Sequence, residues 1–456
     1  MKKREIVLLC MLCLLFIQLP AQQTYNLQSC LKYALENNHN LKKSQLDREK
    51  SIQAHREVLG SLMPQINGSA GLNDNIKKAK FIMPNFINSM LPPNAQDPNA
   101  PKYMTIEMGT NYAANFATTL NQQILNFSLF NAVDIAKTAE NLAALGVESK
   151  EEDIITQTAN LYYAIQATNY AIAQFDSSFV LIDKMIKTME VSFANGLIKK
   201  VDLNRLKVNK VNMASQRSTI ENAAEVQKNL LKLQMGLDMN QLIEVEKINI
   251  AFFENQSMVK SEFNFDLNSQ IPYKLILQQE NIVRLQRKAA VFESLPVLSL
   301  AFNYQYNGVS DEFFKGETNY WYPSSAIGLN LRVPIFAGFS RTAKIRQADI
   351  EQRKILEDAS TLEQSLNMAW LNAVNKLDNS CKTIQAQHEN MELAQEVYTV
   401  SENNFTQGLA PMSDVLNGSS SLIQSQVSYA DALNNYMKAY IELLKANGTI
   451  RSLIEK

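Results

Sequence analysis

Apolar side chains recur with a helical period over two long stretches of the chain. Between Leu161 and Phe193 the apolar positions are separated by alternating steps of four and three residues, as in the heptads of a coiled coil. A second, weaker seam runs through Ile384, Met391, Tyr398 and Phe405. The pattern predicts two very long helices, over 128–195 and 340–406, each roughly 100 Å long at ~1.5 Å per residue.

The residues that usually interrupt helices are absent from these stretches. The sequence has no proline from 102 to 271 and no glycine between Phe339 and Gln407. Most prolines lie instead within 64–101 and 272–334, which separate the helical stretches. Because proline and glycine mark turns and loops, this distribution supports long uninterrupted helices.

Apolar and polar residues alternate with a period of two in strand pairs predicted over about 63–126 and 296–336. From Leu298 to Tyr306 every second residue is apolar or aromatic, and the residues between them are Ser, Ala, Asn or Gln. This pattern is typical of β-strands with one apolar and one polar face. Flanking aromatic residues suggest the girdle of an outer-membrane barrel. The girdle candidates are Tyr112, Phe302, Tyr304, Tyr306, Tyr320, Trp321 and Tyr322.

Four strands per chain cannot close a barrel in a membrane. Lipid offers no hydrogen-bond partner to the backbone of an open sheet edge, and the smallest single-chain barrels have about eight strands. Other copies of the chain must therefore complete the sheet. Three copies would supply twelve strands, four from each copy.

The same turn motif occurs in both halves of the chain. The pattern Gly-Leu-x(4)-Asp begins at Gly196 and at Gly408 and ends at Asp202 and at Asp414. Glycine allows the backbone to reverse between two helices, and an acid in the first turn of the next helix faces the positive end of its dipole. Each half reads as helix, strand pair, long helix, turn and long helix. The motif therefore indicates two tandem structural repeats in a mainly α-helical chain with membrane β-strands.

The repeats set the expected domain boundaries. We expect a signal peptide over 1–22, a first repeat over 23–238, a connecting segment over 239–268, a second repeat over 269–448 and a tail over 449–456. The turns between the long helices are expected at 194–198 and 406–410. The signal peptide is inferred from Lys2, Lys3 and Arg4, followed by a short apolar run, and it places the protein outside the cytosol.

Candidate chemistry is sparse in this sequence. Beyond the signal peptide the cysteines are Cys30 and Cys381, which have no metal-ligand spacing. The histidines His39, His55 and His388 are isolated on helical stretches. We therefore expect no catalytic residues, metal site or cofactor, and no enzyme. A formal net charge of −1 argues against nucleic acid as a partner.

The order of these elements resembles the TolC-type outer-membrane efflux protein family over essentially the whole mature chain. The matching segments are "YNLQSCLKYALENNHNLKKSQLD", "SLMPQINGSAG", "SLPVLSLAFNY", "VPIFAGFSR" and the two Gly-Leu turns. The resemblance implies a homotrimer in the outer membrane of a Gram-negative bacterium. Its twelve-stranded β-barrel would continue into a periplasmic α-barrel, with 239–268 and the residues after Gly448 in a belt around the waist.

The resemblance also implies roles for individual residues. Gly196, Leu197, Gly408 and Leu409 would form the periplasmic tip, where a membrane-fusion adaptor linked to an inner-membrane pump of RND or ABC type docks. Asp202, Asp414 and Asn417 would lie at the periplasmic entrance. Well-known members carry a basic residue and a further acid where this chain has Ala410 and Asn417. The contacts that close the entrance therefore differ, and Lys199 and Lys200 are candidates to replace them.

The first strand pair is longer than the second. Its excess, around "FIMPNFINSMLPPNAQDPNAPKY", is rich in proline and asparagine and is expected to be an irregular extracellular loop.

The favoured function is a passive exit duct that carries substrates from a pump and adaptor to the exterior. The outer-membrane component of a type I protein secretion system is an alternative with the same fold. A trimeric surface adhesin and a soluble coiled-coil scaffold are alternatives from another class. An adhesin keeps its four strands together at the C-terminus, whereas here they are divided between the halves.

Overall fold

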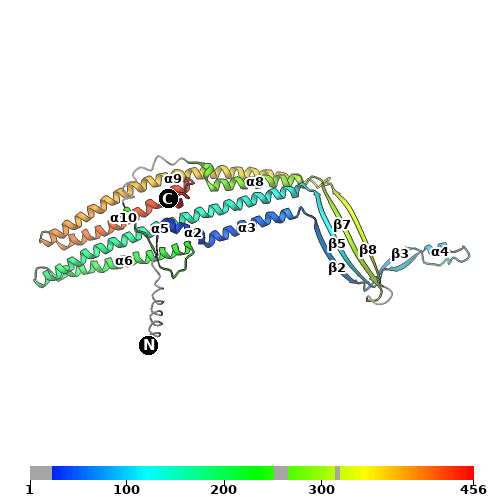
Figure 1. Ribbon diagram of the computed structural model, residues 1–456, viewed down its shortest axis with the longest axis horizontal. Coiled ribbons are helices and arrows are strands. Elements are labelled where there is room, and N and C mark those ends of the chain that lie inside the picture. The colour runs from blue at the N-terminus through cyan, green and yellow to red at the C-terminus, as the bar shows by residue number, and fades with distance from the viewer. Residues whose placement is uncertain (1–22, 251–264, 314–318, 456) are drawn as a thin grey trace, which may run out of the picture. The chain divides into compact units, whose positions relative to one another are not determined.

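The chain divides into two compact units, which are treated separately. The computed structural model describes residues 23–250, 265–313 and 319–455, so the expected signal peptide over 1–22 lies outside the described residues. The helical unit comprises Met1–Lys50, Glu140–Glu280 and Lys354–Lys456. The strand unit comprises Ser51–Ala139 and Asn281–Arg353. The unit boundaries fall within the helices α3, α5, α8 and α9. Figure 1 labels these helices.

Two long helical hairpins provide most of the helical unit. In the first, α5 (Phe127–Ala194) is followed by α6 (Lys200–Met235). In the second, α9 (Ser340–Thr406) is followed by α10 (Met412–Ala446). The leading helices contain 68 and 67 residues, and their bounds agree with the predicted stretches to within one residue. The prediction of two very long helices is confirmed.

The apolar seams of these four helices meet in a shared core. Ile182 and Met189 of α5, and Leu206 and Met213 of α6, are at most 2 % exposed. They belong to one cluster with residues of α9 and α10. Burying each such side chain contributes about 1.5–3 kcal/mol. The packing of these seams therefore holds the hairpins together over this part of the unit.

A glycine brings α9 and α10 close together in this core. A Cβ atom added at Gly418 would lie 3.2 Å from the Cα atom of Tyr398, which is tighter than ordinary packing. Tyr398 itself is 2 % exposed. The absence of a side chain at position 418 therefore allows the close approach of the two helices.

A second core joins the start of the described chain to distant segments. The short strand β1 (Gln23–Tyr25) pairs in parallel with β6 (Ile243–Val245). The adjoining helix α2 (Leu27–Asn37) buries Leu31 completely in a cluster that includes Leu231 of α6. The C-terminal helix α11 (Ser452–Glu455) contributes Leu453 to the same cluster. Three-residue strands carry no measurable sequence period, so the pairing of β1 with β6 was not predicted.

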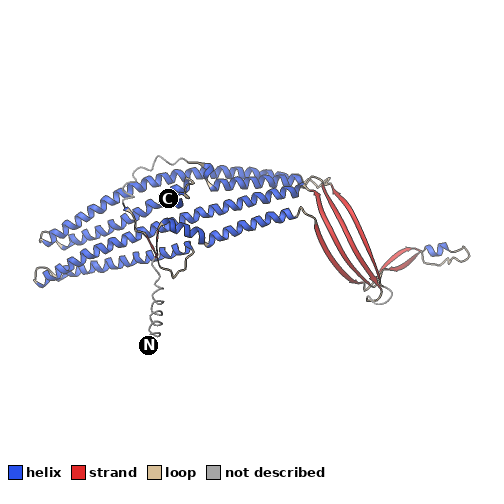
Figure 2. Ribbon diagram, in the orientation of Figure 1, coloured by secondary structure: helices blue, strands red, loops and turns tan. Residues whose placement is uncertain are grey.

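Four antiparallel strands form the main sheet of the strand unit (Figure 2). They are β2 (Gln65–Asp74), β5 (Tyr112–Leu125), β7 (Val297–Ser310) and β8 (Tyr320–Arg332), in the order β2-β5-β7-β8. The helices α3 (His39–Gly60) and α8 (Ile271–Phe292) precede β2 and β7, and the 3-10 turn η1 (Leu267–Ser269) precedes α8. The central pair, β5 with β7, joins strands from the two halves of the sequence.

The segment expected to be an irregular loop is partly an ordered hairpin. Strands β3 (Ala79–Pro84) and β4 (Tyr103–Met108) pair antiparallel, and the short helix α4 (Phe86–Met90) follows β3. The Asn85 side chain accepts a hydrogen bond from the Asn88 N–H at 3.2 Å and so caps α4. The expectation was wrong for the residues of β3, α4 and β4, whereas 91–102, where most of the prolines of the segment lie, forms neither helix nor strand.

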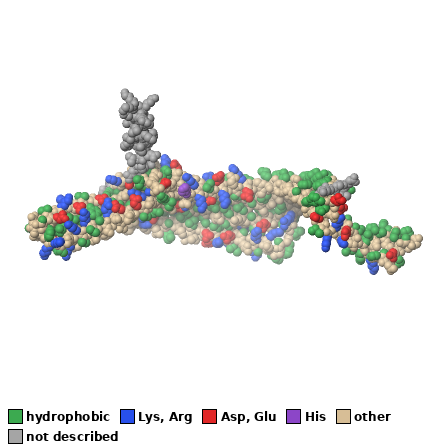
Figure 3. Space-filling model, turned by 90° about the horizontal axis from the view of Figure 1, so that it is seen from below, with side chains coloured by type: hydrophobic (Ala, Val, Ile, Leu, Met, Phe, Trp, Pro, Cys, Tyr) green, Lys and Arg blue, Asp and Glu red, His purple; other side chains and the backbone are tan. Residues whose placement is uncertain are grey.

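The helices of the described residues show no membrane-spanning character. None of them is both long and apolar enough to cross a bilayer. On the face visible in Figure 3, acidic and basic side chains are interspersed with hydrophobic ones along the helices.

Each of the four long helices of the hairpins is followed by a glycine with a positive φ. Gly236, which follows α6, allows a test of whether glycine is required there. Its φ is 71°, and a Cβ atom there would lie 2.7 Å from the Asn37 carbonyl oxygen. We expect Gly236→Ala to lower the free energy of unfolding by about 2–4 kcal/mol, because strain and a backbone clash add together.

The matched control is Gly146→Ala, within α5, where nothing lies within 4 Å of the added Cβ atom. This change should be neutral or stabilise by about 0.5–1 kcal/mol, as for glycine in a helix interior. Thermal unfolding of the two variants measures the difference. Equal melting temperatures would contradict the explanation.

Candidate functional site

The two Gly-Leu turns have the same backbone conformation. Gly196 and Gly408 have φ values of 73° and 77°, in the left-handed region that favours glycine. The Gly196 N–H donates to the Phe193 carbonyl oxygen at 2.9 Å, and the Gly408 N–H donates to that of Phe405 at 3.0 Å. These bonds satisfy carbonyl groups that the ends of α5 and α9 would otherwise leave unpaired.

The leucine after each glycine completes a Schellman motif. The Leu197 N–H donates to the Ser192 carbonyl oxygen at 2.9 Å, and the Leu409 N–H donates to that of Asn404 at 2.8 Å. In such motifs the residue after the glycine often packs on an apolar residue one turn back. Here those residues are Ser192 and Asn404, and the leucines are 76 % and 73 % exposed. Both turns therefore present an apolar side chain to solvent.

The acids of the motif begin the next helices, as predicted. Asp202 and Asp414 lie in the first turns of α6 and α10. Their N–H groups donate to the Lys199 and Pro411 carbonyl oxygens, each at 3.1 Å. A carboxylate at this place is stabilised by the helix dipole. The backbone equivalence of the two turns thus extends to the start of the following helices.

The charges of the two turns differ. Asp202 lies 3.9 Å from Arg205, and the exposed Lys199 and Lys200 make the first turn basic. At the second turn Ala410 follows the motif leucine, and Asn417 is exposed one helical turn after Asp414. The two surfaces are therefore alike in shape and unlike in charge.

The main sheet has one apolar face and one polar face. The pairing of β5 with β7 and of β7 with β8 places Leu120, Phe302 and Ile327 side by side on one face. Asn303 lies on the opposite face, next to Thr119 and Ala326. On the apolar face Phe302 is 37 % exposed and Ile327 is 72 % exposed within a single copy. A large apolar face left open to solvent indicates a surface that another medium or molecule covers.

Aromatic rings cross three strands of this apolar face. Trp321 stacks on Tyr306 with ring centroids 5.3 Å apart and on Phe116 at 6.1 Å. The ring of Trp321 lies over Gly308, where an added Cβ atom would come within 2.7 Å of it. Tyr112 lies at the same end of the face and meets Phe313 edge-on at 5.3 Å. Stacked rings of this kind stabilise neighbouring strands.

The aromatic girdle candidates are divided between the two faces. Trp321 pairs with Gly308 and shares a face with Tyr304 and Tyr306, whereas Tyr320 and Tyr322 pair with Val309 and Asn307 on the other face. A one-residue step in a strand reverses the direction of the side chain. For Tyr320 and Tyr322 the register does not agree with a place in the girdle, and for the other five residues the role stays a prediction.

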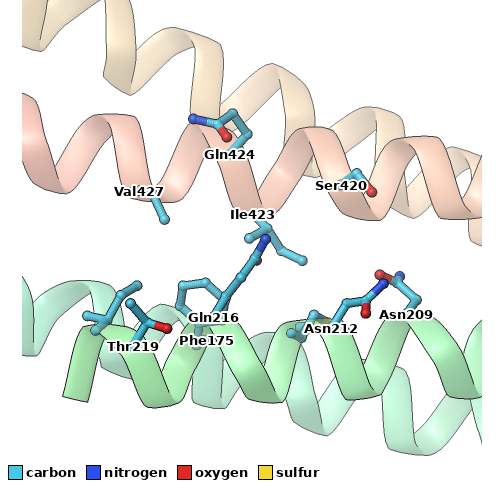
Figure 4. A pocket seen from close by; sticks show the side chains of 11 residues that line it. Phe175, Asn209, Asn212, Gln216, Thr219, Ser420, Ile423, Gln424 and Val427 are labelled. Atoms are coloured by element: carbon cyan, nitrogen blue, oxygen red, sulfur yellow. The ribbon is translucent and has the colours of Figure 1, made fainter. Parts of the chain in front are cut away.

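A cleft between the two helical hairpins, lined by both polar and apolar side chains, was not anticipated from the sequence. Its volume is about 480 Å³, and Asn209, Asn212 and Gln216 of α6 face Ser420 and Gln424 of α10 across it (Figure 4). Close by, the Asn209 side-chain amide donates to Ser419 Oγ at 3.2 Å, and Ser178 Oγ donates to Gln426 Oε1 at 3.3 Å. The amide and hydroxyl residues on the inner sides of these helices are the feature of the sequence that could have indicated this cleft.

The described cysteines and histidines are the chain's candidate metal ligands and nucleophiles. Among the described residues, no group of three or more His, Cys, Asp or Glu side chains is arranged to hold a metal ion. Cys30 is completely buried, and its burial, together with the charge of Glu246, raises the pKa of its thiol to about 12. A thiol held in its protonated form is a poor nucleophile.

Known proteins share both sequence and fold with this chain. Residues 279–449 match the family described as outer membrane efflux protein. Outer membrane protein TolC of Escherichia coli strain K12 is 22 % identical over 450 residues, covering 94 % of this chain and 83 % of that protein.

Solved structures agree over a similar length. The outer membrane protein VceC of Vibrio cholerae has a TM-score of 0.71 at 15 % identity, covering 92 % of this chain and 96 % of VceC. The CmeC outer membrane channel of Campylobacter jejuni has a TM-score of 0.71 at 16 % identity, covering 93 % of this chain and 85 % of CmeC. These matches confirm the predicted resemblance of this chain to the TolC-type outer-membrane efflux protein family.

Proposed function

We propose that this protein is the outer-membrane exit duct of an efflux system, which conducts substrates passively to the exterior of a Gram-negative cell. The observation that carries the proposal is the four-stranded sheet with one apolar face and two open edges. Within the described residues β2 pairs only with β5, and β8 pairs only with β7. In lipid the backbone groups of such edges require partners.

Three copies of the chain supply those partners. The β8 edge of one copy pairs with the β2 edge of the next, which gives a closed barrel of twelve strands, four from each copy. The apolar face meets the lipid and the polar face lines the pore. The homotrimer and the two tandem repeats are parts of this proposal.

The helical hairpins extend the duct into the periplasm as an α-barrel. Their turns form its tip, where the exposed Leu197 and Leu409 offer apolar anchors to a periplasmic adaptor. Through the adaptor the duct connects to an inner-membrane pump. Asp202, Asp414 and Asn417 lie just beyond the turns, so that threefold repetition places them in rings at the entrance.

The names of the relatives favour an efflux channel over the other candidates. They include an outer membrane channel and an outer membrane efflux protein family. An adhesin is not favoured, because the sheet is built equally from strands before α5 and strands before α9. Secretion of polypeptides would use the same duct, and nothing specific to this chain favours it.

Cross-linking between strand edges tests the closure of the barrel. Ser69 of β2 and Ala326 of β8 lie on the polar face at opposite edges, separated by β5 and β7. At about 4.8 Å per strand and with a two-residue offset along the strands, they are roughly 16 Å apart within one copy, too far for direct linkage. We expect the double variant Ser69→Cys and Ala326→Cys, made in a chain with Cys30→Ala and Cys381→Ser, to form covalent trimers in membranes with a short bis-maleimide.

Each single-cysteine variant is the control and should give no trimer. A protein that stays a monomer in the membrane by native mass measurement, or a double variant that links only within one chain, would refute the proposed barrel.

The turn leucines test the proposed tip. We expect the pair Leu197→Ser and Leu409→Ser to reduce export at least about tenfold, because two apolar anchors are lost at a docking surface. The trimer should be unaffected, because both side chains are exposed. The matched control is the pair Leu197→Met and Leu409→Met, which keeps the apolar area and should retain export. Export and adaptor co-purification measure the effect, and normal export by the serine pair would exclude this role for the tip.

A further inference from the structure

A second cleft in the helical unit contains charged residues that the proposed duct does not use. Its volume is about 570 Å³, within the ~300–1,000 Å³ typical of sites for small organic molecules. It is formed by α5, α9, α10 and the start of α8. Its walls include Glu152, Asp153, Gln270, Pro272, Leu366, Ala369, Ala373, Lys376, Glu442 and Lys445.

Two ion pairs neutralise most of the charge in this cleft. Lys376 Nζ lies 2.7 Å from a Glu442 carboxylate oxygen, and Lys445 Nζ lies 2.9 Å from Asp153 Oδ1. Both lysines of the cleft are therefore already paired. Glu152 remains as a third acid, so the lining holds three carboxyl groups and two lysines.

Glu152 is buried without a partner for its carboxylate. The residue is only 9 % exposed. Among the described residues, the Glu152 carboxylate makes no ion pair and accepts no hydrogen bond, although it lines the cleft. A buried carboxylate is costly unless a cation or donors compensate it.

The groups around Glu152 shift the pKa of its carboxyl group in opposite directions. Burial raises the pKa of its carboxyl group above the ordinary value, and the opposing attraction of Arg451 and Lys445 is the next largest influence. Asp153 and Glu148 raise the pKa further. Arg451 is itself paired with Glu151 at 2.8 Å. A positive charge brought into the cleft would therefore stabilise the ionised form of Glu152.

The rest of the cleft suits an apolar body of modest size. Pro272, Leu366, Ala369 and Ala373 provide its apolar wall. The Gln270 side-chain amide is fixed because it donates to the Ala446 carbonyl oxygen at 3.0 Å. The described residues contain no group of acids arranged for a metal ion. The chemistry therefore matches an organic cation more closely than a bare ion.

We propose that this cleft binds a small organic cation with an apolar body, whose ammonium or guanidinium group pairs with the Glu152 carboxylate while the body lies against Leu366 and Ala369. The site is separate from the turns and the sheet, and the proposal does not depend on transport through the duct.

Binding of a fluorescent amine tests the site in the purified full-length protein. The probe is dansylcadaverine, a primary ammonium on a five-carbon stem with an aromatic body, and its uncharged comparison is N-pentyl dansylamide. We expect saturable binding of the cationic probe with much weaker binding of the neutral one. Glu152→Gln should weaken binding of the cation about tenfold, as expected for loss of a charge-assisted contact.

Two further variants separate a site from a general effect of charge or folding. Glu389→Gln removes an exposed acid of α9 outside the cleft and should leave binding unchanged. Ala369→Trp fills the cleft from an exposed position without altering charge and should abolish binding. The proposal is overturned if no saturable binding occurs, if both probes bind equally, or if Glu152→Gln and Glu389→Gln have the same effect.

Discussion

Every backbone N–H and carbonyl group of a β-strand in lipid requires a hydrogen-bond partner, and the proposed architecture depends on this requirement. The main sheet ends at β2 on one side and at β8 on the other. The apolar face across all four strands makes lipid the natural medium for that sheet. Closure by further copies satisfies both edges and gives the polar face a water-filled interior. The proposed oligomer therefore follows from backbone chemistry before any contact between side chains is considered.

The helices follow from a different balance of forces. Each hairpin removes an apolar seam from water by packing it in a shared core. Glycine turns at the helix ends provide hydrogen bonds to carbonyl groups of the last turn. At the two tips this solution leaves Leu197 and Leu409 exposed, because the residues one turn back are polar. The same backbone motif thus ends a helix and creates an apolar surface. Since the first turn is basic and the second is not, the two turns present surfaces of the same backbone shape and different charge.

The interior of the helical unit contains two clefts of contrasting chemistry. The one between α6 and α10 is lined with apolar side chains and with uncharged amides and hydroxyls, which can bond to water without a net charge. The one at Glu152 holds a largely buried acid beside two completed ion pairs. Neutral polar groups in a water-accessible gap cost little, whereas an unpaired buried charge costs considerably more. Of the two clefts, the one at Glu152 is therefore the one in which the proposed cationic ligand would contribute more to stability.

Local patterns in the sequence determined the long helices, the glycine turns and the two faces of the strands. Periods of 3.5 and two residues are properties of single elements, so Ile182 and Met189 or Phe302 and Tyr304 identify their buried or apolar faces without knowledge of their partners. The order of elements was also enough to suggest the family.

Only the tertiary structure decided which distant segments meet. The pairing of β1 with β6, the face occupied by Tyr320 and Tyr322, and the ordered hairpin β3–β4 depend on register and on contacts between residues far apart in the sequence. The burial of Glu152 is of the same kind, because on a single helix it is one acid among several. Its environment is set by α9 and α10, which the local pattern of α5 does not encode.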